Sequence, residues 1–410
     1  MLPDPLVQPD LPDLPDLPVE PVEPVLPVQP GRSGLRDLAV RPDGSVLRDL
    51  PGVLTAAQLL ETVDSLVRAQ QPAGSIPWPD GHTDAWDHVE CAMAMVLGGR
   101  LDAARAAYGW LAASQRPDGS WATSYDQLEV LDAKADTNQC AYVAVGVWQW
   151  WQLTGELDLP RRLWPVVRAA LDYVVGMQAP SGALHWAREA DGAVVTDALL
   201  TGSASSYQSL RCGVALAELL GEPQPEWELA AGRLQHAVAH HREAFLDKDR
   251  FSMDWYYPVL GGALRGAAGV ERIDASWATF IVPDVGARCV SDRPWVTGAE
   301  TAELAIALLC LDDRERALQV FTDVQHLREA DGSYWTGLVF DEGVRWPAER
   351  SSWTAAAMVL AADCLVGGPT LALFTGEDLP TGVLLPADAC GPGTCTQQAS
   401  SVGEGLTVVS

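Results

Sequence analysis

The sequence predicts an all-α fold in which about six helical hairpins close into a ring, an α/α toroid. Helical periodicity runs through most of residues 51–367, whereas strand-like alternation is scarce. A phrase of Gln, a short turn holding Gly, and Trp follows four helical stretches. The four copies are Gln71–Trp78, Gln115–Trp121, Gln178–Trp186 and Gln325–Trp335. Gly-containing turns of this kind are typical of helix ends, and their irregular spacing favours a closed ring over an open solenoid.

About a dozen helices are expected, and several have clear start or stop signals. Thr55 caps the first helix, Asp84 opens the second, and Gly98-Gly99 separates the second from the third. The expected ranges are 56–69, 85–97, 101–113, 137–154, 160–177, 203–220, 226–242, 253–264, 273–280, 298–311, 314–327 and 351–365. Ring closure buries both faces of the inner helices, which explains apolar runs such as Cys140–Trp148.

We expect one domain, residues 51–367, between two flexible ends. Residues 1–50 begin with an arm, up to about residue 32, that alternates Pro with Leu, Val, Asp and Glu. Because Pro removes backbone donors and fixes φ, this arm is expected to be extended and disordered. Residues 368–410 end in a Gly- and Ser-rich stretch and are expected to form a flexible tail.

The composition restricts the partners. The chain has 48% hydrophobic residues and 16 Trp, enough for a large core, but no uncharged apolar run of about 20 residues, so no membrane span is expected. With 27 basic and 55 acidic residues the formal charge is -28, which disfavours nucleic acid as a partner. No secretory signal is visible, so we expect a cytoplasmic protein. The eight Cys show no metal-site spacing, and no motif indicates a metal or nucleotide cofactor.

Candidate functional residues gather just before the expected inner helices. In a ring of hairpins the loops at one end surround a central cavity, so polar clusters there are suspects for ligand binding. The clusters are 84–90, 132–138, 254–257 and 346–353. Aromatic rings beside carboxylates can stack on a sugar ring or stabilise a carbocation, and composition does not separate these two uses.

Four carboxylates are candidates for catalysis: Asp87, Asp197, Asp254 and Glu349. If glycosidic bonds are cleaved, Asp197 and Glu349 are the candidate general acid and base, since carboxylates in different environments can have separated pKa values. Asp254 would donate a proton in a cyclase or bind hydroxyl groups in a sugar enzyme. Each also has a purely structural interpretation, such as a helix-entry turn for Asp197 or a surface ion pair for Glu349.

The candidate ligand-binding residues are mainly aromatic or acidic. They are Trp86, His88, Glu90, Asp136, Asn138, Trp255, Tyr256, Tyr257, Arg288, Trp295, Trp346 and Trp353. Trp86 and Glu90 share one helical face, and Arg288 could hold a phosphate or carboxylate. The structural alternatives are a buried core histidine for His88 and a helix cap for Asp136.

Gln115–Trp121 resembles the Gln-Trp repeat of the terpenoid cyclases and prenyltransferases, whose toroids use it to tie helix ends together. Pro51–Leu365 also resembles actinobacterial proteins labelled prenyltransferase, through Trp86-Asp87-His88-Val89-Glu90 and Ser252–Pro258 among other stretches. The resemblance implies an α/α toroid enzyme that acts on an isoprenoid or lipid-linked substrate in an aromatic, acidic central cavity. This is the leading expectation for function.

The same segment is similar in layout to the six-hairpin glycosidases, glucoamylase-like proteins in particular. Trp86-Asp87 opens the second helix, and Trp353-Thr354-Ala355-Ala356 begins a late one. This second resemblance implies an inverting glycoside hydrolase in which Asp197 and Glu349 lead. A third alternative is a scaffold that binds a glycan or a lipid without turning it over.

Overall fold

The computed structural model describes residues 40–380 and 382–385. The helices are α1 (Ala56–Ala69), α2 (Ala85–Leu97), α3 (Leu101–Ser114), α4 (Thr137–Ala141), α5 (Val143–Thr154), α6 (Asp158–Gly176), α7 (Leu200–Leu220), α8 (Pro225–His240), α9 (Ser252–Leu260), α10 (Gly266–Phe280), α11 (Gly298–Leu309), α12 (Arg314–Asp323), α13 (Ser352–Leu365) and α14 (Pro369–Thr375), with 3-10 turns η2 (Arg242–Ala244) and η3 (Val324–Leu327). The Pro-rich arm and the Gly- and Ser-rich end that we expected lie outside the described residues.

Every expected helix is present, and most ends differ by a few residues; α10, expected at 273–280, begins seven residues earlier, at Gly266. The stretch expected at 137–154 is two helices, α4 and α5, that meet at Tyr142. The expected tail at 368–410 begins with an ordered helix instead, because α14 buries Leu373 and Phe374 against the rest of the fold.

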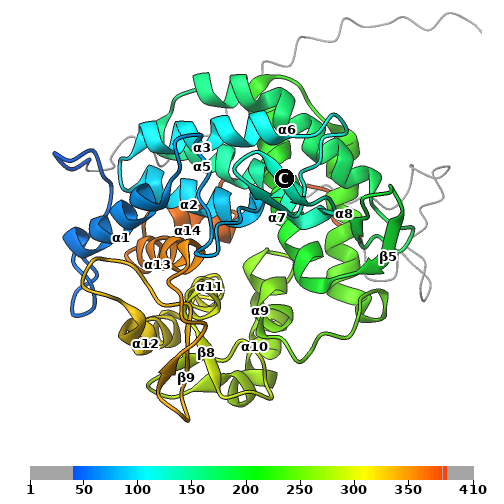
Figure 1. Cartoon of the computed structure of the whole chain (residues 1–410). Helices are drawn as coiled ribbons and strands as arrows, with labels where there is room; N and C mark the ends of the chain where they lie inside the picture. Colours follow the sequence, from blue (N-terminus) through cyan, green and yellow to red (C-terminus); the bar gives the residue numbers. More distant parts are fainter. Residues whose placement is uncertain (1–39, 381, 386–410) are drawn as a thin grey trace, which may run out of the picture. The chain divides into compact units, whose positions relative to one another are not determined.

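Within the described residues, six inner segments close a ring: α2, α4–α5, α7, α9, α11 and α13 (Figure 1). Each packs on the next, and α13 packs back on α2. The outer helices α1, α3, α6, α8, α10 and α12 pair with them to make six hairpins. The predicted all-α toroid is therefore confirmed.

Burial follows from position in this ring. All of α11 is buried, and α13 is buried except at Trp353, so apolar residues occur on all sides of both helices, interrupted by few polar side chains such as Glu300 and Glu303. The outer helix α1 buries only one stripe, formed by Ala56, Leu59, Thr62, Val63 and Leu66. Among the described residues no single helix is long and apolar enough to span a membrane. The bent pair α13 and α14 meets the length and hydropathy criteria only when the two helices are taken together.

The repeated Gln turns connect consecutive outer helices. The side-chain amide of Gln115 donates to the carbonyls of Gly119 in its own turn and of Val166 in α6, both at 2.9 Å. Gln178 makes the same pair of bonds one hairpin later, the second of them to α8. Each turn therefore ties the end of one outer helix to the next.

In the first copy, Gln70 makes these two hydrogen bonds, and not Gln71, which we had expected to begin this copy of the repeat. Gln70 donates to the carbonyls of Gly74, at 3.0 Å, and Ala103, at 2.9 Å. The reason is spacing, because the Gln must lie four residues before the Gly, as Gln115 does before Gly119.

Glycine is required in these turns for two reasons. Gly119 has φ 89°, and a Cβ there would lie 2.1 Å from the carbonyl oxygen of Ala169 in α6. Gly332 has φ 87° and also approaches Glu61 of α1 too closely for a side chain, with 2.4 Å between its ideal Cβ position and the backbone. The last copy of the turn therefore closes the ring onto the first helix.

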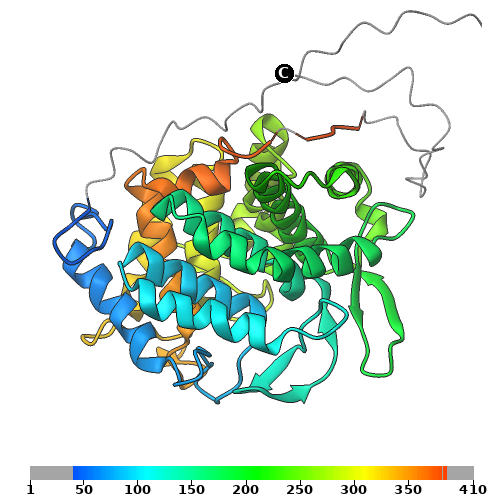
Figure 2. The ribbon, with the colours of Figure 1, turned by 90° about the horizontal axis from the view of Figure 1, so that it is seen from above.

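Short hairpins occupy the connections that lead from outer to inner helices. The strands are β1 (Ser124–Asp126), β2 (Glu129–Asp132), β3 (Ala135–Asp136), β4 (His185–Arg188), β5 (Val194–Ala198), β6 (Ile281–Val282), β7 (Gly286–Ala287), β8 (Trp295–Thr297), β9 (Gly337–Val339) and β10 (Val344–Arg345). They form four small antiparallel sheets, β1-β2, β3-β4-β5, β6-β7 and β10-β9-β8. Figure 2 shows the β1-β2 and β4-β5 hairpins on one side of the ring, away from the last described residues.

Candidate active site

Five carboxylates at the N-terminal halves of α2 and α11 form what we call the acidic cluster. Its members are Asp84, Asp87, Glu90, Glu300 and Glu303, each no more than 8% exposed. The helices α2 and α11 flank α13 in the ring. None of the five forms an ion pair with a described residue. Buried, unpaired carboxyl groups are costly, and such groups concentrate at functional sites.

Asp84 and Asp87 form the outer part of the cluster. Asp84 caps α2, and its Oδ1 accepts the backbone N–H groups of Trp86 and Asp87, both at 2.9 Å. The Trp78 indole N–H donates to both acids, at 3.0 Å to Asp84 Oδ2 and 2.8 Å to Asp87 Oδ2. Burial, and then the neighbouring charge of Asp84, raise the pKa of Asp87 well above its usual range. Asp87 therefore retains its proton at pH values where a free Asp would be ionised.

Glu90 lies deeper on the same helix. Burial raises its pKa to about 7, although the Tyr142 hydroxyl, which donates to Oε1 at 3.1 Å, opposes the shift. The Trp353 indole lies beside Glu90 without a well-formed hydrogen bond and acts in the same direction as Tyr142. Glu90 can therefore change protonation near neutral pH.

The α11 carboxylates differ in their partners. Glu303 accepts hydroxyl groups from Tyr257, at 2.8 Å, and from Tyr256, and burial together with the Glu90 charge raises its pKa well above the usual value. Glu300, one turn earlier, is 4% exposed, and its Oε2 has no hydrogen-bond partner among the described residues. One of these acids is therefore held by tyrosines, while the other keeps a free oxygen.

Aromatic rings from four inner helices meet beside the cluster. The Trp86 ring centroid lies 5.9 Å from that of Tyr142, 6.0 Å from Tyr257 and 6.2 Å from Trp353. Trp353 also lies 6.1 Å from Trp78. These contacts bring residues from opposite parts of the chain to one place, with apolar ring faces next to carboxyl groups.

Buried polar atoms without partners surround the same region. Within the described residues these include Trp86 Nε1, Glu90 Oε2, Asn138 Oδ1 and Glu300 Oε2. They come from the first two turns of α2, α4 and α11. Because an unmade hydrogen bond costs about 1–3 kcal/mol at each buried group, such a set indicates a polar ligand that bonds to them.

Several predicted residues do come together here: Asp87, Trp86, Glu90, Tyr256, Tyr257 and Trp353. Asp136 caps α4 and accepts the Trp186 indole N–H at 2.7 Å, so its cap interpretation holds. Asp254 is buried on α9, where the Thr201 hydroxyl donates to Oδ1 at 2.6 Å. Its Oδ2 lies 3.9 Å from the Arg242 guanidinium, so neighbouring residues account for both oxygens of Asp254.

The side chains of His88 and Trp255 are instead buried against the outer helices α3 and α10. His88 Nδ1 accepts the Ile76 N–H at 3.2 Å, and Nε2 donates to the Ala107 carbonyl at 2.9 Å, while burial lowers the pKa of the imidazole to about 4. The ring is thus a neutral core group that joins α2 to α3. Trp255 stacks on Phe280 of α10 at 5.1 Å. The polar and aromatic pattern did not reveal which face of each helix these residues occupy.

Three further candidates lie on or near the β8-β9-β10 sheet. Trp295 and Trp346 have ring centroids 4.7 Å apart, and the Trp295 indole N–H donates to the Trp346 carbonyl at 2.9 Å. Trp346 is 51% exposed. The Arg288 guanidinium lies 5.0 Å over the Phe340 ring and donates to the carbonyl of Arg293. These contacts give Arg288 a structural role that does not require a bound phosphate or carboxylate.

The predicted acid and base make no hydrogen bond to the acidic cluster within the described residues, although Glu349 bonds to Thr336, whose carbonyl accepts the N–H of Gly298 at the start of α11. Asp197 is exposed on strand β5, and no hydrogen bond or ion pair involves its side chain in the described part of the chain. Glu349 is half-buried in the loop before α13 and accepts the Thr336 hydroxyl at 3.3 Å. Neither has a hydrogen bond to Asp87 or Glu300 within the described ranges.

The sequence analysis named Asp84 only as part of the 84–90 cluster, and it missed Trp78, Tyr142, Glu300 and Glu303 as site residues. Glu300 and Glu303 offered a usable signal, because two acids one turn apart interrupt the otherwise apolar α11. A buried inner helix does not present carboxylates to solvent, so these acids had to face a site or a partner.

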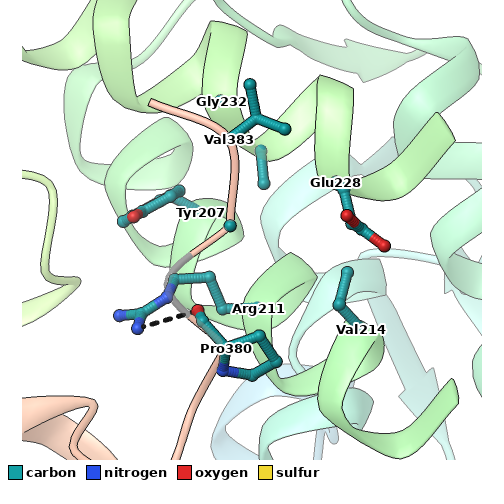
Figure 3. A pocket seen from close by; sticks show the side chains of 9 residues that line it. Tyr207, Arg211, Val214, Glu228, Gly232, Pro380 and Val383 are labelled. Carbon is teal, nitrogen blue, oxygen red and sulfur yellow. Dashed lines mark hydrogen bonds between the residues drawn. The ribbon is translucent and has the colours of Figure 1, made fainter. Parts of the chain in front are cut away.

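The pocket in Figure 3 is not this site. It lies between α7, α8 and the segment that follows α14, and is lined by Tyr207, Arg211, Glu228 and Val383 among others. Arg211 donates to the Pro380 carbonyl at 3.3 Å, which holds that segment against α7. Its volume of about 10 Å³ is that of about one water, too small for a sugar.

Comparison with solved structures supports the fold. A glycosidase variant in complex with glucose has a TM-score of 0.60 at 15% identity, covering 76% of this chain and 97% of that one. A D-mannose isomerase has a TM-score of 0.59 at 12% identity, covering 76% and 96%. At these identities the likeness shows the α/α toroid alone. No protein-family model matches the chain.

A curated relative identifies the family. The MMP endo-(1,4)-3-O-methyl-alpha-D-mannosidase of Mycolicibacterium hassiacum is 54% identical over 346 residues, which span 84% of this chain and 96% of the relative. The expectation of a prenyltransferase or terpenoid cyclase is therefore wrong, because this relative is a mannosidase. In this chain the Gln-Trp turns that carried the expectation tie the ends of outer helices together, a role that does not depend on the reaction. The chain belongs to the family of this endo-mannosidase.

Proposed function

We propose that the protein is a glycoside hydrolase that cleaves α-mannosidic bonds within a 3-O-methylated mannose polysaccharide. The relative's activity supports the substrate class. The set of buried polar atoms without partners beside five carboxyl groups is the observation that carries a sugar site. Sugar hydroxyl groups both donate and accept hydrogen bonds, so one ligand can satisfy an indole N–H and a carboxylate oxygen together.

Asp87 is the general acid in this proposal. Its raised pKa favours the protonated form that a general acid needs, and Asp84 and Trp78 fix its position through the shared indole contact. Asp87 gives this proton to the glycosidic oxygen as the bond from that oxygen to the anomeric carbon breaks.

Glu300 is the general base. Its free Oε2 can accept a hydrogen bond from a water, and it takes a proton as the water oxygen bonds to the anomeric carbon. Glu303 does not fit this role, because two tyrosine hydroxyl groups occupy its oxygens and its raised pKa favours the protonated form. Glu303 and Glu90 instead form the floor of the site.

The reaction is inverting in this scheme. Inverting hydrolases place their carboxyl groups about 6.5–9.5 Å apart to leave room for a water. α2 and α11 are separated in the ring by α13, and packed helices have axes about 8–10 Å apart, which leaves space between their inward side chains.

The test uses a 3-O-methylated α-1,4-mannan and follows products by mass spectrometry. Wild type is expected to release oligosaccharides that have gained one water, with the anomeric configuration inverted in the first NMR spectra. Asp87→Asn and Glu300→Gln are each expected to lower kcat by about 100-fold or more. Asp197→Asn and Glu349→Gln are the matched controls, expected to keep wild-type kcat. Full activity in Asp87→Asn, or loss only in the controls, would overturn the assignment.

A further inference from the structure

The β8-β9-β10 sheet presents one apolar face that the fold leaves partly uncovered. In the register of this sheet, Trp295 lies opposite Val339, and Val339 lies opposite Val344. Trp346 follows Val344 by two residues, and its N–H donates to the Gly337 carbonyl at 3.0 Å. Residues directly opposite one another, and residues two apart on one strand, point to the same face of a sheet. Trp295, Val339, Val344 and Trp346 therefore form one surface, which we call the tryptophan platform.

The other face of this sheet is turned toward the protein. Val296 of β8 is fully buried, and the Arg345 guanidinium of β10 donates to His326 Nδ1 at 3.0 Å. The tryptophan platform is thus the outer face, on which Val344 is 49% and Trp346 is 51% exposed. Large apolar side chains that gather on one exposed face mark a binding surface more often than those scattered singly.

The two tryptophans are held in fixed positions. Their ring centroids are 4.7 Å apart at 79°, an edge-to-face arrangement, and the Trp295 indole N–H donates to the Trp346 carbonyl at 2.9 Å. Glycine at position 337 leaves room for the Trp295 ring, because a Cβ there would lie 2.5 Å from the indole nitrogen and from the Val296 carbonyl oxygen. The exposed Trp346 ring therefore rests on a rigid support, so little side-chain freedom is lost when a ligand covers it.

The platform leads into the candidate active site through both of its tryptophans. Trp295 lies five residues before Glu300, so their Cα atoms are at most about 18 Å apart. Between them, Thr297 lies on the platform face of β8, is 2% exposed, and has a hydroxyl oxygen without a hydrogen-bond partner among the described residues. Trp346 precedes the loop to α13, whose Trp353 belongs to the site. A ligand of several linked rings can therefore reach from Glu300, across Thr297, to the platform.

The chemistry of the platform fits the apolar face of a sugar ring. A pyranose presents C–H groups on its faces and hydroxyl groups at its edges, so an indole can cover one face while the hydroxyl groups stay in water. A second copy of the chain is a poorer occupant, because the formal charge of -28 opposes association. The same charge disfavours an anionic lipid surface.

We propose that the tryptophan platform is a sugar-binding subsite away from the bond that is cleaved, in which one pyranose ring of the polysaccharide stacks on the Trp346 indole. This inference rests on the proposed function. Trp295 is a positioning residue here, because it acts through its contacts with Trp346. A subsite that does not touch the reacting atoms adds affinity for long chains, so it determines the chain length that the enzyme prefers.

The test is Trp346→Ala, assayed on a 3-O-methylated α-1,4-mannan and on the shortest oligosaccharide of that series that wild type cleaves. Covering about 60 Å² of apolar surface at about 25 cal/mol/Å² corresponds to about tenfold in affinity. We expect kcat/KM on the polysaccharide to fall about tenfold through KM, while kcat, and kcat/KM on the shortest oligosaccharide, stay within twofold of wild type. Trp346→Tyr keeps an aromatic ring and should retain most of the affinity. Val270→Ala, at an exposed position on α10, is the matched control and is expected to change none of these values.

Binding separates failure of this inference from failure of the proposed function. In an Asp87→Asn background, calorimetry with the polysaccharide should show about tenfold weaker binding when Trp346→Ala is added, and little change when Trp346→Tyr is added. If wild type binds the polysaccharide but does not cleave it, the proposed function fails, and this comparison still tests the platform. Unchanged binding, or an equal loss on long and short chains, would overturn the role of the platform. A wild-type dimer in analytical ultracentrifugation that Trp346→Ala dissociates, with sugar binding unchanged, would show that a second copy is the occupant instead.

Discussion

Replacing Glu90 by Gln tests the electrostatics of the acidic cluster directly. The Glu90 pKa rises from 4.5 to about 7 because the carboxyl is buried. Between these pH values the unfolded chain is ionised at this position while the folded protein keeps the proton. The stability that this group contributes is therefore full below about pH 4.5 and is lost as the pH rises through about 7. A shift of this size corresponds to about 3 kcal/mol.

The variant removes this pH dependence but keeps the shape and the hydrogen bond, since the Gln carbonyl oxygen can still accept from Tyr142. Urea denaturation at pH 5 and pH 8 gives the free energy of unfolding for each protein. Relative to wild type, Glu90→Gln should gain about 2–3 kcal/mol between pH 5 and pH 8.

Glu129→Gln, at an exposed position on β2, is the control, because such surface substitutions usually change stability by less than about 0.5 kcal/mol. A difference between wild type and Glu90→Gln that is the same at both pH values would refute the reasoning. It would mean that the carboxyl at this position does not keep its proton on folding.

Three further predictions concern the turns, the thiols and the acid. Gly119→Ala should cost several kcal/mol in thermal denaturation, because its Cβ would meet Ala169, whereas Gly192→Ala has the same φ of 89° with no atom within 4 Å and should cost about 1–2 kcal/mol. Equal losses would remove the close approach to α6 as the cause. Burial raises the pKa of the Cys140 and Cys212 thiols to about 12, so iodoacetamide at pH 8 should leave both unmodified until the protein is denatured, as peptide mass spectrometry can show. Rapid modification of either thiol in the native protein would contradict this. Because Asp87 must be protonated to act, kcat/KM should fall as the pH rises through its elevated pKa, and an activity that increases into the alkaline range would contradict that role.

The helices could be predicted because their signals are local. Thr55 forms a capping box with Gln58, and Asp84 caps α2 through its own carboxylate, as the sequence implied. α14 was missed because seven residues beginning with Pro369 give too short a pattern, and its burial depends on contacts with distant helices.

The candidate active site could be predicted only in part. Trp86, Asp87 and Glu90 were found because an acidic and aromatic helix start is visible in one window of sequence. Their partner Glu300 lies more than 200 residues later in an apolar helix, and only ring closure brings α11 to the same side as α2. Asp197 and Glu349 fitted the pattern of loop carboxylates, but neither has a hydrogen bond to the acidic cluster within the described residues.

The contact between the last repeated turn and α1 has a consequence for synthesis. Arg68 donates to the Asp331 carbonyl and Arg328 to Glu61, across 263 and 267 residues. At about 5–20 residues per second, the ribosome makes α1 roughly 15–50 s before the hairpin that completes its surroundings. During that interval α13 has not yet been made, so the apolar stripe of α1, with Leu59, Val63 and Leu66, lacks one of its two inner-helix partners. The newly made chain therefore leaves part of this apolar stripe uncovered until its final hairpin emerges.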